Sequence, residues 1–128
     1  MHVKNLSQQH FYPAAAQSTV VAVAELEAVR KSLLEALERL SQEPDTAISI
    51  AVEAARRAFA LIPVQRRRED RFSELAFKLQ SLERAFRASR ARVRVSAPGV
   101  EREQALKDAK ADLEEALSIV EQLERSLR

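Results

Sequence analysis

The stretch LKDAKADLEEALSIVEQLERSL, residues 106–127, decides the fold class because its apolar side chains recur at alternating spacings of three and four residues. The positions on this stripe are Leu106, Ala109, Leu113, Ala116, Val120, Leu123 and Leu127. A helix turns about 100° per residue, so this spacing gathers the apolar side chains along one side. We predict a helix over 100–127 that packs on other helices, as in a bundle or a coiled coil.

Three earlier segments carry stripes with the same spacing and predict three further helices, over 14–41, 45–62 and 64–93. In chain order, the stripes are Ala22, Leu26, Val29, Leu33, Leu37 and Leu40; Ile48, Val52, Ala55, Phe59 and Ile62; and Phe72, Leu75, Leu79, Leu82 and Phe86. Alanine, leucine, glutamate and arginine dominate the remaining positions, a composition that favours helix throughout.

Proline and glycine mark the expected boundaries between the helices. Pro44, Pro63 and Pro98 lie where the stripes are interrupted. Proline is tolerated in the first turn of a helix and disfavoured in its interior, so each of the three predicts a helix start. Gly99 is the single glycine of the chain, and residues 96–99 are its strongest loop signal.

These stripes predict an all-α fold, an antiparallel up-down four-helix bundle in which each stripe faces a common axis. The alternative is an arrangement of three long helices, one of them kinked at Pro63, that oligomerisation completes. A chain of 128 residues with 46% hydrophobic content is enough for one core. Residues 1–13 do not follow the helical pattern, so we expect an N-terminal arm there and a single helical-bundle domain over 14–128.

Composition excludes several classes of protein. The chain has no cysteine, which excludes disulfides, thiolate metal sites and cysteine nucleophiles. Its uninterrupted apolar runs, such as that over 20–24, are far shorter than the roughly 20 residues of a membrane-spanning helix. The N-terminus lacks the cationic segment and apolar run of a secretory signal. We therefore expect no membrane association and a cytoplasmic location.

The sequence offers no catalytic apparatus. Both histidines, His2 and His10, lie in the expected arm, away from the helices that would present a metal ligand or a general base. Nucleophilic catalysis by serine needs a base that a scaffold holds firmly, and neither histidine has such a position. We predict no catalytic residue, no metal site, no cofactor and no small-molecule substrate.

Carboxylate pairs at helical spacing are the one feature that would suit an enzyme, because magnesium-dependent helical enzymes use such pairs on nucleotides. The pairs are Glu35/Glu38, Asp108/Asp112 and Glu121/Glu124. Most lie near a basic residue, as Glu35 does near Arg39, and are expected to form ion pairs instead. Glu124 falls within the apolar stripe of its helix, and we expect it to pair with Arg68 or Arg71.

Charge is distributed unevenly along the chain. Residues 54–98 carry twelve Lys/Arg and four Asp/Glu, whereas residues 1–53 carry four and seven and residues 99–128 carry five and eight. A basic helix could neutralise phosphates, and the candidates for this surface are Arg66, Arg67, Arg68, Arg84, Arg87 and Arg94. The other interpretation is that the two acidic flanks supply ion-pair partners for these arginines, and we favour it because the arginines border the apolar stripe on both sides.

Several apolar residues point away from the predicted stripes. Phe77 lies about 180° from the stripe of 64–93, on a face that it shares with Ser81, Ala85 and Ala88. Similar candidates for a protein interface are Ile50, Leu61, Val20 and Val21. Single exposed apolar residues are ordinary, but several such sites together favour a homo-oligomer or a protein partner.

The sequence therefore predicts a non-enzymatic interaction protein, an adaptor, chaperone-like protein or assembly subunit that self-associates or docks on a larger protein. The alternative is a nucleic-acid-binding accessory protein that uses the basic 56–94 segment. A magnesium-dependent enzyme that handles nucleotides is the second alternative.

Overall fold

Four α-helices make up the computed structural model, which describes the backbone of residues 3–128 and the side chains of residues 19–128. They are α1 (Val3–Arg39), α2 (Pro44–Ala60), α3 (Asp70–Val95) and α4 (Val100–Leu127), with a short 3-10 helix, η1 (Val64–Arg66), before α3. No strand occurs within residues 3–128. The prediction of an all-α helical bundle is confirmed.

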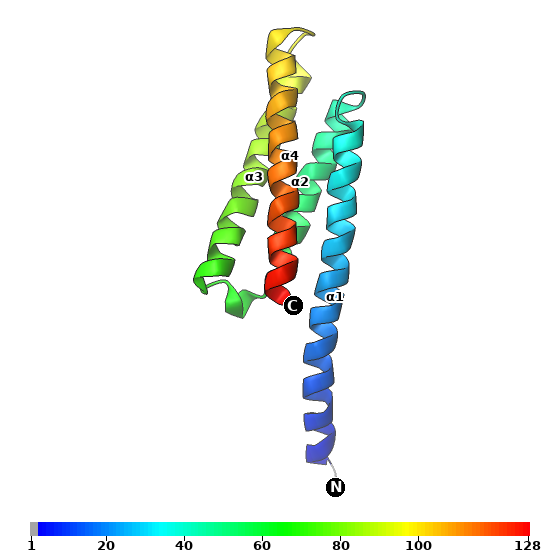
Figure 1. Cartoon of the computed structure of the whole chain (residues 1–128), viewed down its shortest axis with the longest axis vertical. Helices are drawn as coiled ribbons and strands as arrows, with labels where there is room; N and C mark the ends of the chain where they lie inside the picture. Colours follow the sequence, from blue (N-terminus) through cyan, green and yellow to red (C-terminus); the bar gives the residue numbers. More distant parts are fainter. Residues whose placement is uncertain (1–2) are drawn as a thin grey trace.

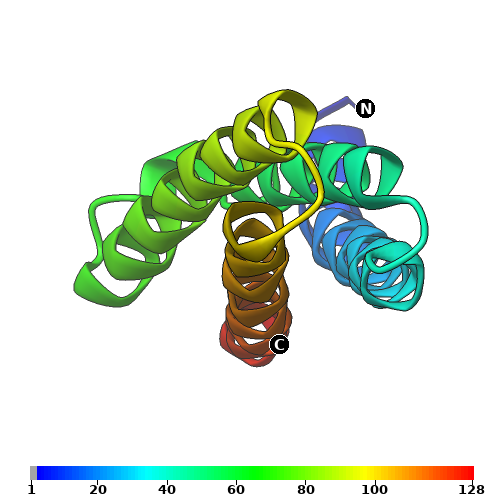
Figure 2. The same ribbon diagram turned by 90° about the horizontal axis from the view of Figure 1, so that it is seen from above.

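Successive helices run in opposite directions, as the up-down pattern requires (Figure 1). Helix α2 contacts all three of the others, while α4 contacts α1 and α3 on its two sides. Seen along the bundle, α1 and α3 therefore lie on opposite sides of the α2–α4 pair (Figure 2).

Helix α2 can lie between its neighbours because most of its buried side chains are small. Seven of its residues are buried, and five of them are alanines: Ala47, Ala51, Ala54, Ala55 and Ala58. Such side chains let neighbouring helices approach closely, and larger residues of the neighbours fill the space between them. The largest fully buried side chains come from all four helices and include Leu26, Leu33, Ile48, Phe72, Phe86, Leu113 and Leu123.

The starts of α2 and α4 agree with the prediction, whereas the start of α3 does not. Pro44 is the first residue of α2, and α4 covers the predicted 100–127. After Pro63, however, the chain forms only η1, and α3 begins at Asp70 instead of residue 64. Here Arg67 holds the turn, because its Nε donates a hydrogen bond to the carbonyl of Ile62 at 3.2 Å.

The alternative fold, with one helix kinked at Pro63, is wrong. Helices α2 and α3 are separate antiparallel helices that pack on each other, and residues 61–69 connect them. The start of α1 also needs correction, because this helix begins at Val3 instead of residue 14. The absence of an apolar stripe in residues 3–13 does not exclude a helix, and Pro13, which removes one backbone hydrogen bond, lies within α1. Whether residues 1–13 act as a separate arm stays a prediction, because their side chains lie outside the described residues.

None of the helices within residues 3–128 combines the length and the apolar character that a membrane crossing needs.

Candidate interaction surfaces

The N-terminal half of α1 extends past the helices that flank it (Figure 1). Leu40, directly after α1, and Leu106 of α4 line one hollow, so at equal rise per residue the end of α4 is level with about residue 19 of α1. Arg57 of α2 pairs with Glu25 of α1 at 3.5 Å, which places the end of α2 level with about residue 22. Two independent contacts therefore agree that both neighbours of α1 end near residue 20.

Val20 and Val21 lie at this point and are exposed over 68% and 58% of their surface. Both were predicted to lie outside the core, and that exposure is confirmed. Their part in an interface stays a prediction.

Phe77 is the second exposed apolar candidate, with 65% of its surface accessible. It occupies the outer face of α3, where Ala88 is exposed and Ser81 and Ala85 are half-buried. The predicted orientation of Phe77 is thus confirmed. Ser81, Ala85 and Ala88 are small, whereas Gln80 and Arg84, three and seven residues after Phe77, are exposed on the same side of the helix.

Ile50 and Leu61 are different, because both are half-buried and pack against the core. The prediction that they point away from the core is wrong. A single stripe is the pattern of a helix with neighbours on one side, whereas α2 has neighbours on three sides and buries a wider arc of its surface. These two residues therefore offer less area to a partner than the sequence suggested.

Four large apolar residues that the stripe analysis did not single out are also exposed: Leu34, Val64, Val95 and Val100. Val95 and Val100 flank the loop between α3 and α4, and Val64 begins η1. The signal for these three in the sequence was proximity to a proline or glycine, because residues at helix ends have few neighbours, whereas Leu34 lies inside α1 and has no such signal.

Most of the predicted basic surface is engaged in contacts within the chain. Arg94 of α3 forms a bidentate pair with Asp45 at the start of α2. Arg87 pairs with Glu83 at 2.8 Å, and Arg66 pairs with Glu69 at 3.2 Å.

Two of these arginines also lie over aromatic rings. The guanidinium carbon of Arg67 is 4.6 Å from the centre of the Phe59 ring, and that of Arg66 is 4.4 Å from the centre of the Phe72 ring. Within residues 19–128, Arg68 and Arg84 are the two predicted basic candidates without an ion pair or a ring contact. Three of the six candidates, Arg66, Arg87 and Arg94, are therefore ion-paired, and of these only Arg94 takes its partner from an acidic flank.

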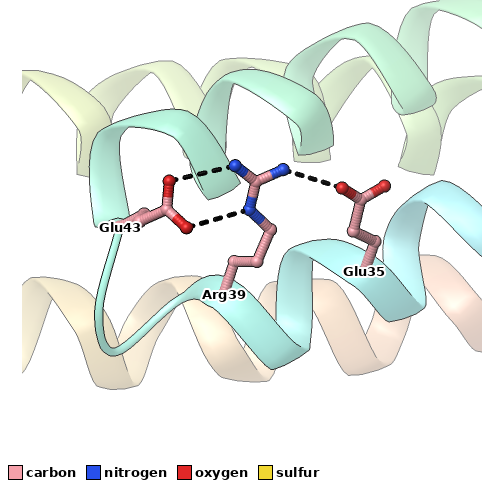
Figure 3. A network of polar contacts seen from close by, with 3 residues as sticks. All are labelled: Glu35, Arg39 and Glu43. Carbon is pink, nitrogen blue, oxygen red and sulfur yellow. Dashed lines mark hydrogen bonds and ion pairs between the residues drawn. The ribbon is translucent and has the colours of Figure 1, made fainter.

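The turn between α1 and α2 is held by a network of three charged residues (Figure 3). Arg39 donates to Glu35 at 2.7 Å and to both carboxylate oxygens of Glu43, at 3.0 and 3.2 Å. The hydrogen bonds from Arg39 lower the pKa of the Glu43 carboxyl, and the two carboxylates raise the pKa of the guanidinium. The predicted pair of Glu35 with Arg39 is confirmed.

Glu124 has a different partner from the one predicted. It is buried, as its place in the stripe suggested, but its carboxylate lies 3.8 Å from Arg128, one turn further along α4. The predicted pairing with Arg68 or Arg71 is wrong, because the end of α4 supplies a nearer cation. Among the described side chains, no three His, Cys, Asp or Glu residues are grouped closely enough to hold a metal ion.

A hollow of about 330 Å³ opens between α3 and α4. Its walls are Ala85, Ala88, Ser89, Arg92, Asp108, Ala111 and Asp112. Arg92 pairs across it with Asp108 at 2.8 Å, and Gln104 donates to the other oxygen of Asp108 at 2.9 Å. These two hydrogen bonds lower the pKa of the Asp108 carboxyl.

Asp112, four residues further along α4, has the opposite shift. Its pKa is raised first by burial and then by the charges of Glu115 and Asp108. The predicted pair Asp108/Asp112 therefore consists of one carboxylate that is already bonded and one that is not. Sequence reasoning identified the spacing of this pair but not the hollow, because the hollow exists only where α3 and α4 meet.

The two histidines lie outside the described side chains. Comparison of the chain with protein-family models, with curated proteins and with solved structures finds no match.

Proposed function

We propose that this protein is a non-enzymatic helical interaction protein that acts in the cytoplasm and binds another protein chain, a second copy of itself included. The observation that carries the proposal is the extension of α1 past α2 and α4, with Val20 and Val21 exposed where its support ends. An unsupported helix of this length is marginally stable in water, because helical stability in proteins comes mainly from packing of an apolar face. A partner chain would supply that packing.

Phe77 supports the same function at a second position. An exposed aromatic side chain is a favourable anchor, because it offers a large apolar area at low cost in side-chain entropy. It lies on α3, which is separated from α1 by the α2–α4 pair (Figure 2), so the two surfaces can act independently.

Light scattering coupled to size-exclusion chromatography tests the proposal. We expect the wild-type chain to elute as an oligomer, or to capture a defined protein from its native host. A double variant, Val20→Ser with Val21→Ser, or the single variant Phe77→Ala, should weaken that association while the bundle stays folded. The matched control is Val95→Ala, which shortens another exposed apolar side chain away from both surfaces.

A chain that is monomeric at every concentration, and that captures the same proteins as the double variant and as Phe77→Ala, would contradict the proposal. Circular dichroism of each variant shows whether the helices remain.

Nucleic-acid binding is the weaker alternative, because most of the candidate arginines already have partners within the chain. Arg68 and Arg84 would be the phosphate contacts. If the protein retards DNA or RNA at low salt, and if Arg68→Gln with Arg84→Gln reduces the salt dependence of that binding, the alternative is correct. The magnesium-dependent alternative predicts turnover of a nucleotide with Mg²⁺, and an assay with a nucleotide panel tests it.

A further inference from the structure

Ser89 is the buried polar residue of α3 that the fold itself does not explain. Only 3% of its surface is exposed. Within the described residues its hydroxyl has no hydrogen-bond partner, although a serine in a helix can bond the carbonyl four residues earlier, as Ser126 does with Gln122 at 2.8 Å. A buried hydroxyl without a partner is costly, so its position in the wall of the α3–α4 hollow needs a reason.

Asp112 lines the same hollow and also has no cation partner among the described residues. The two groups share a property, because a carboxylate accepts hydrogen bonds and a hydroxyl can accept them. A ligand that matches both must donate. The other carboxylate of the hollow, Asp108, is occupied by Arg92 and Gln104.

The charge around the hollow selects a cation. Arg92 is neutralised by its pair with Asp108, while Asp112 and the neighbouring Glu115 carry uncompensated negative charge. An anion would find no free positive group there. A divalent metal ion is disfavoured because only one carboxylate is free to bind it. The three alanines Ala85, Ala88 and Ala111 add an apolar wall, which suits an alkyl chain.

We propose that the hollow between α3 and α4 binds an alkylammonium group, which donates hydrogen bonds to the carboxylate of Asp112 and the hydroxyl of Ser89. The group belongs either to a small free amine or to a lysine side chain of a partner protein. An ammonium has three donors, and the volume of about 330 Å³ lies at the lower end of the range for small-ligand sites. Burial and the neighbouring carboxylates raise the pKa of Asp112, and a bound cation would offset both effects.

Methyl NMR of the full chain, labelled at alanine, tests the site with n-butylammonium chloride at constant ionic strength and pH 7. We expect saturable shifts at the methyl groups of Ala85, Ala88 and Ala111. The variant Asp112→Asn should weaken binding at least about tenfold, since it removes a charge-assisted hydrogen bond. The matched control Glu121→Gln removes an exposed carboxylate from the same helix and should leave the affinity unchanged.

A second variant keeps the test independent of effects on folding. Ser89→Ala should weaken binding while the protein melts at the same or a higher temperature, because the hydroxyl has no partner in the free chain. The neutral isostere n-butanol should produce no saturable shift at these methyl groups. Binding of n-butanol as tight as that of n-butylammonium, or an affinity that is the same in Asp112→Asn and wild type, would overturn the proposal, as would the absence of any saturable shift.

The two sources of the ammonium are separated by one further probe, N-acetyl-lysine methylamide. Tighter binding of this capped lysine than of n-butylammonium assigns the site to a lysine side chain of a partner. Binding of n-butylammonium alone assigns it to a small amine, because the backbone of the capped lysine is then excluded.

Discussion

Single side chains in this bundle differ in whether they stabilise or destabilise the fold, and Asp45 and Ser89 illustrate the two cases. Ser89 buries a hydroxyl without a hydrogen-bond partner in the wall of the α3–α4 hollow, so we expect it to lower the stability of the free protein. Asp45 is exposed, yet its pair with Arg94 joins the start of α2 to the end of α3. Ser89 therefore has a role only if the hollow binds a ligand, whereas Asp45 has a role in the fold itself.

The variant Ser89→Ala should raise the free energy of unfolding by about 1 kcal/mol, because it removes an unsatisfied buried hydroxyl and adds helix propensity. Urea denaturation measures the change. Ser73→Ala, at an exposed position of the same helix, is the control and should gain only the propensity contribution of a few tenths of a kcal/mol. A loss of stability in Ser89→Ala would show that the hydroxyl has a partner in solution.

The pair of Asp45 with Arg94 should make stability depend on pH in the acid range. The hydrogen bond from Arg94 lowers the pKa of Asp45 in the folded chain, so its stabilising contribution is present above the ordinary carboxyl pKa of about 3.9. That contribution is lost as the pH falls through the lowered pKa. Asp45→Asn should therefore melt below the wild type at pH 7, and the two melting temperatures should converge towards about pH 2.

Asp70→Asn is the control for this comparison, because Asp70 lies in the first turn of α3 without an ion pair among the described residues. It should reproduce any effect of the helix dipole alone. A difference between wild type and Asp45→Asn that stays constant from pH 7 to about pH 2 would exclude the ion pair as its source.

Two of the helices, α2 and α4, start where a proline or a glycine sets the backbone geometry. Pro44 begins α2, while the α3–α4 connection depends on Gly99, whose backbone angles of φ 150° and ψ −161° are accessible almost only to glycine. Space is not the constraint there, because a Cβ added at Gly99 would meet no atom within 4 Å. The start of α4 is therefore set by this one residue and by Pro98.

Gly99→Ala should lower the free energy of unfolding by about 1–3 kcal/mol through backbone strain alone. Urea denaturation measures the loss, and circular dichroism should show an unchanged helix content before unfolding. Ser96→Ala, in the same loop but with an ordinary extended backbone, is the control and should have little effect. If the two variants are equally stable, the loop adopts another conformation in solution.

At the scale of the whole molecule, the central place of α2 organises the rest. Its alanines let α1, α3 and α4 each pack closely on α2. Helices α1 and α3 lie on opposite sides of the molecule. The outer face of α3 and the N-terminal half of α1 therefore remain available to other molecules at the same time. We infer that a partner bound at Val20 and Val21 would not obstruct Phe77 or the α3–α4 hollow.

The sequence by itself determined that the chain forms four helices, though not where α1 and α3 begin, because a helix is stabilised by neighbours three and four residues apart and its apolar stripe is visible in that spacing. This is why α4 and the exposure of Phe77 agree with the prediction. Only the tertiary structure decided how many neighbours each helix has, and so it buried Ile50 and Leu61 and paired Arg94 with Asp45. The hollow of Ser89 and Asp112 has the same origin, since its walls come from two helices whose relative placement no local spacing encodes.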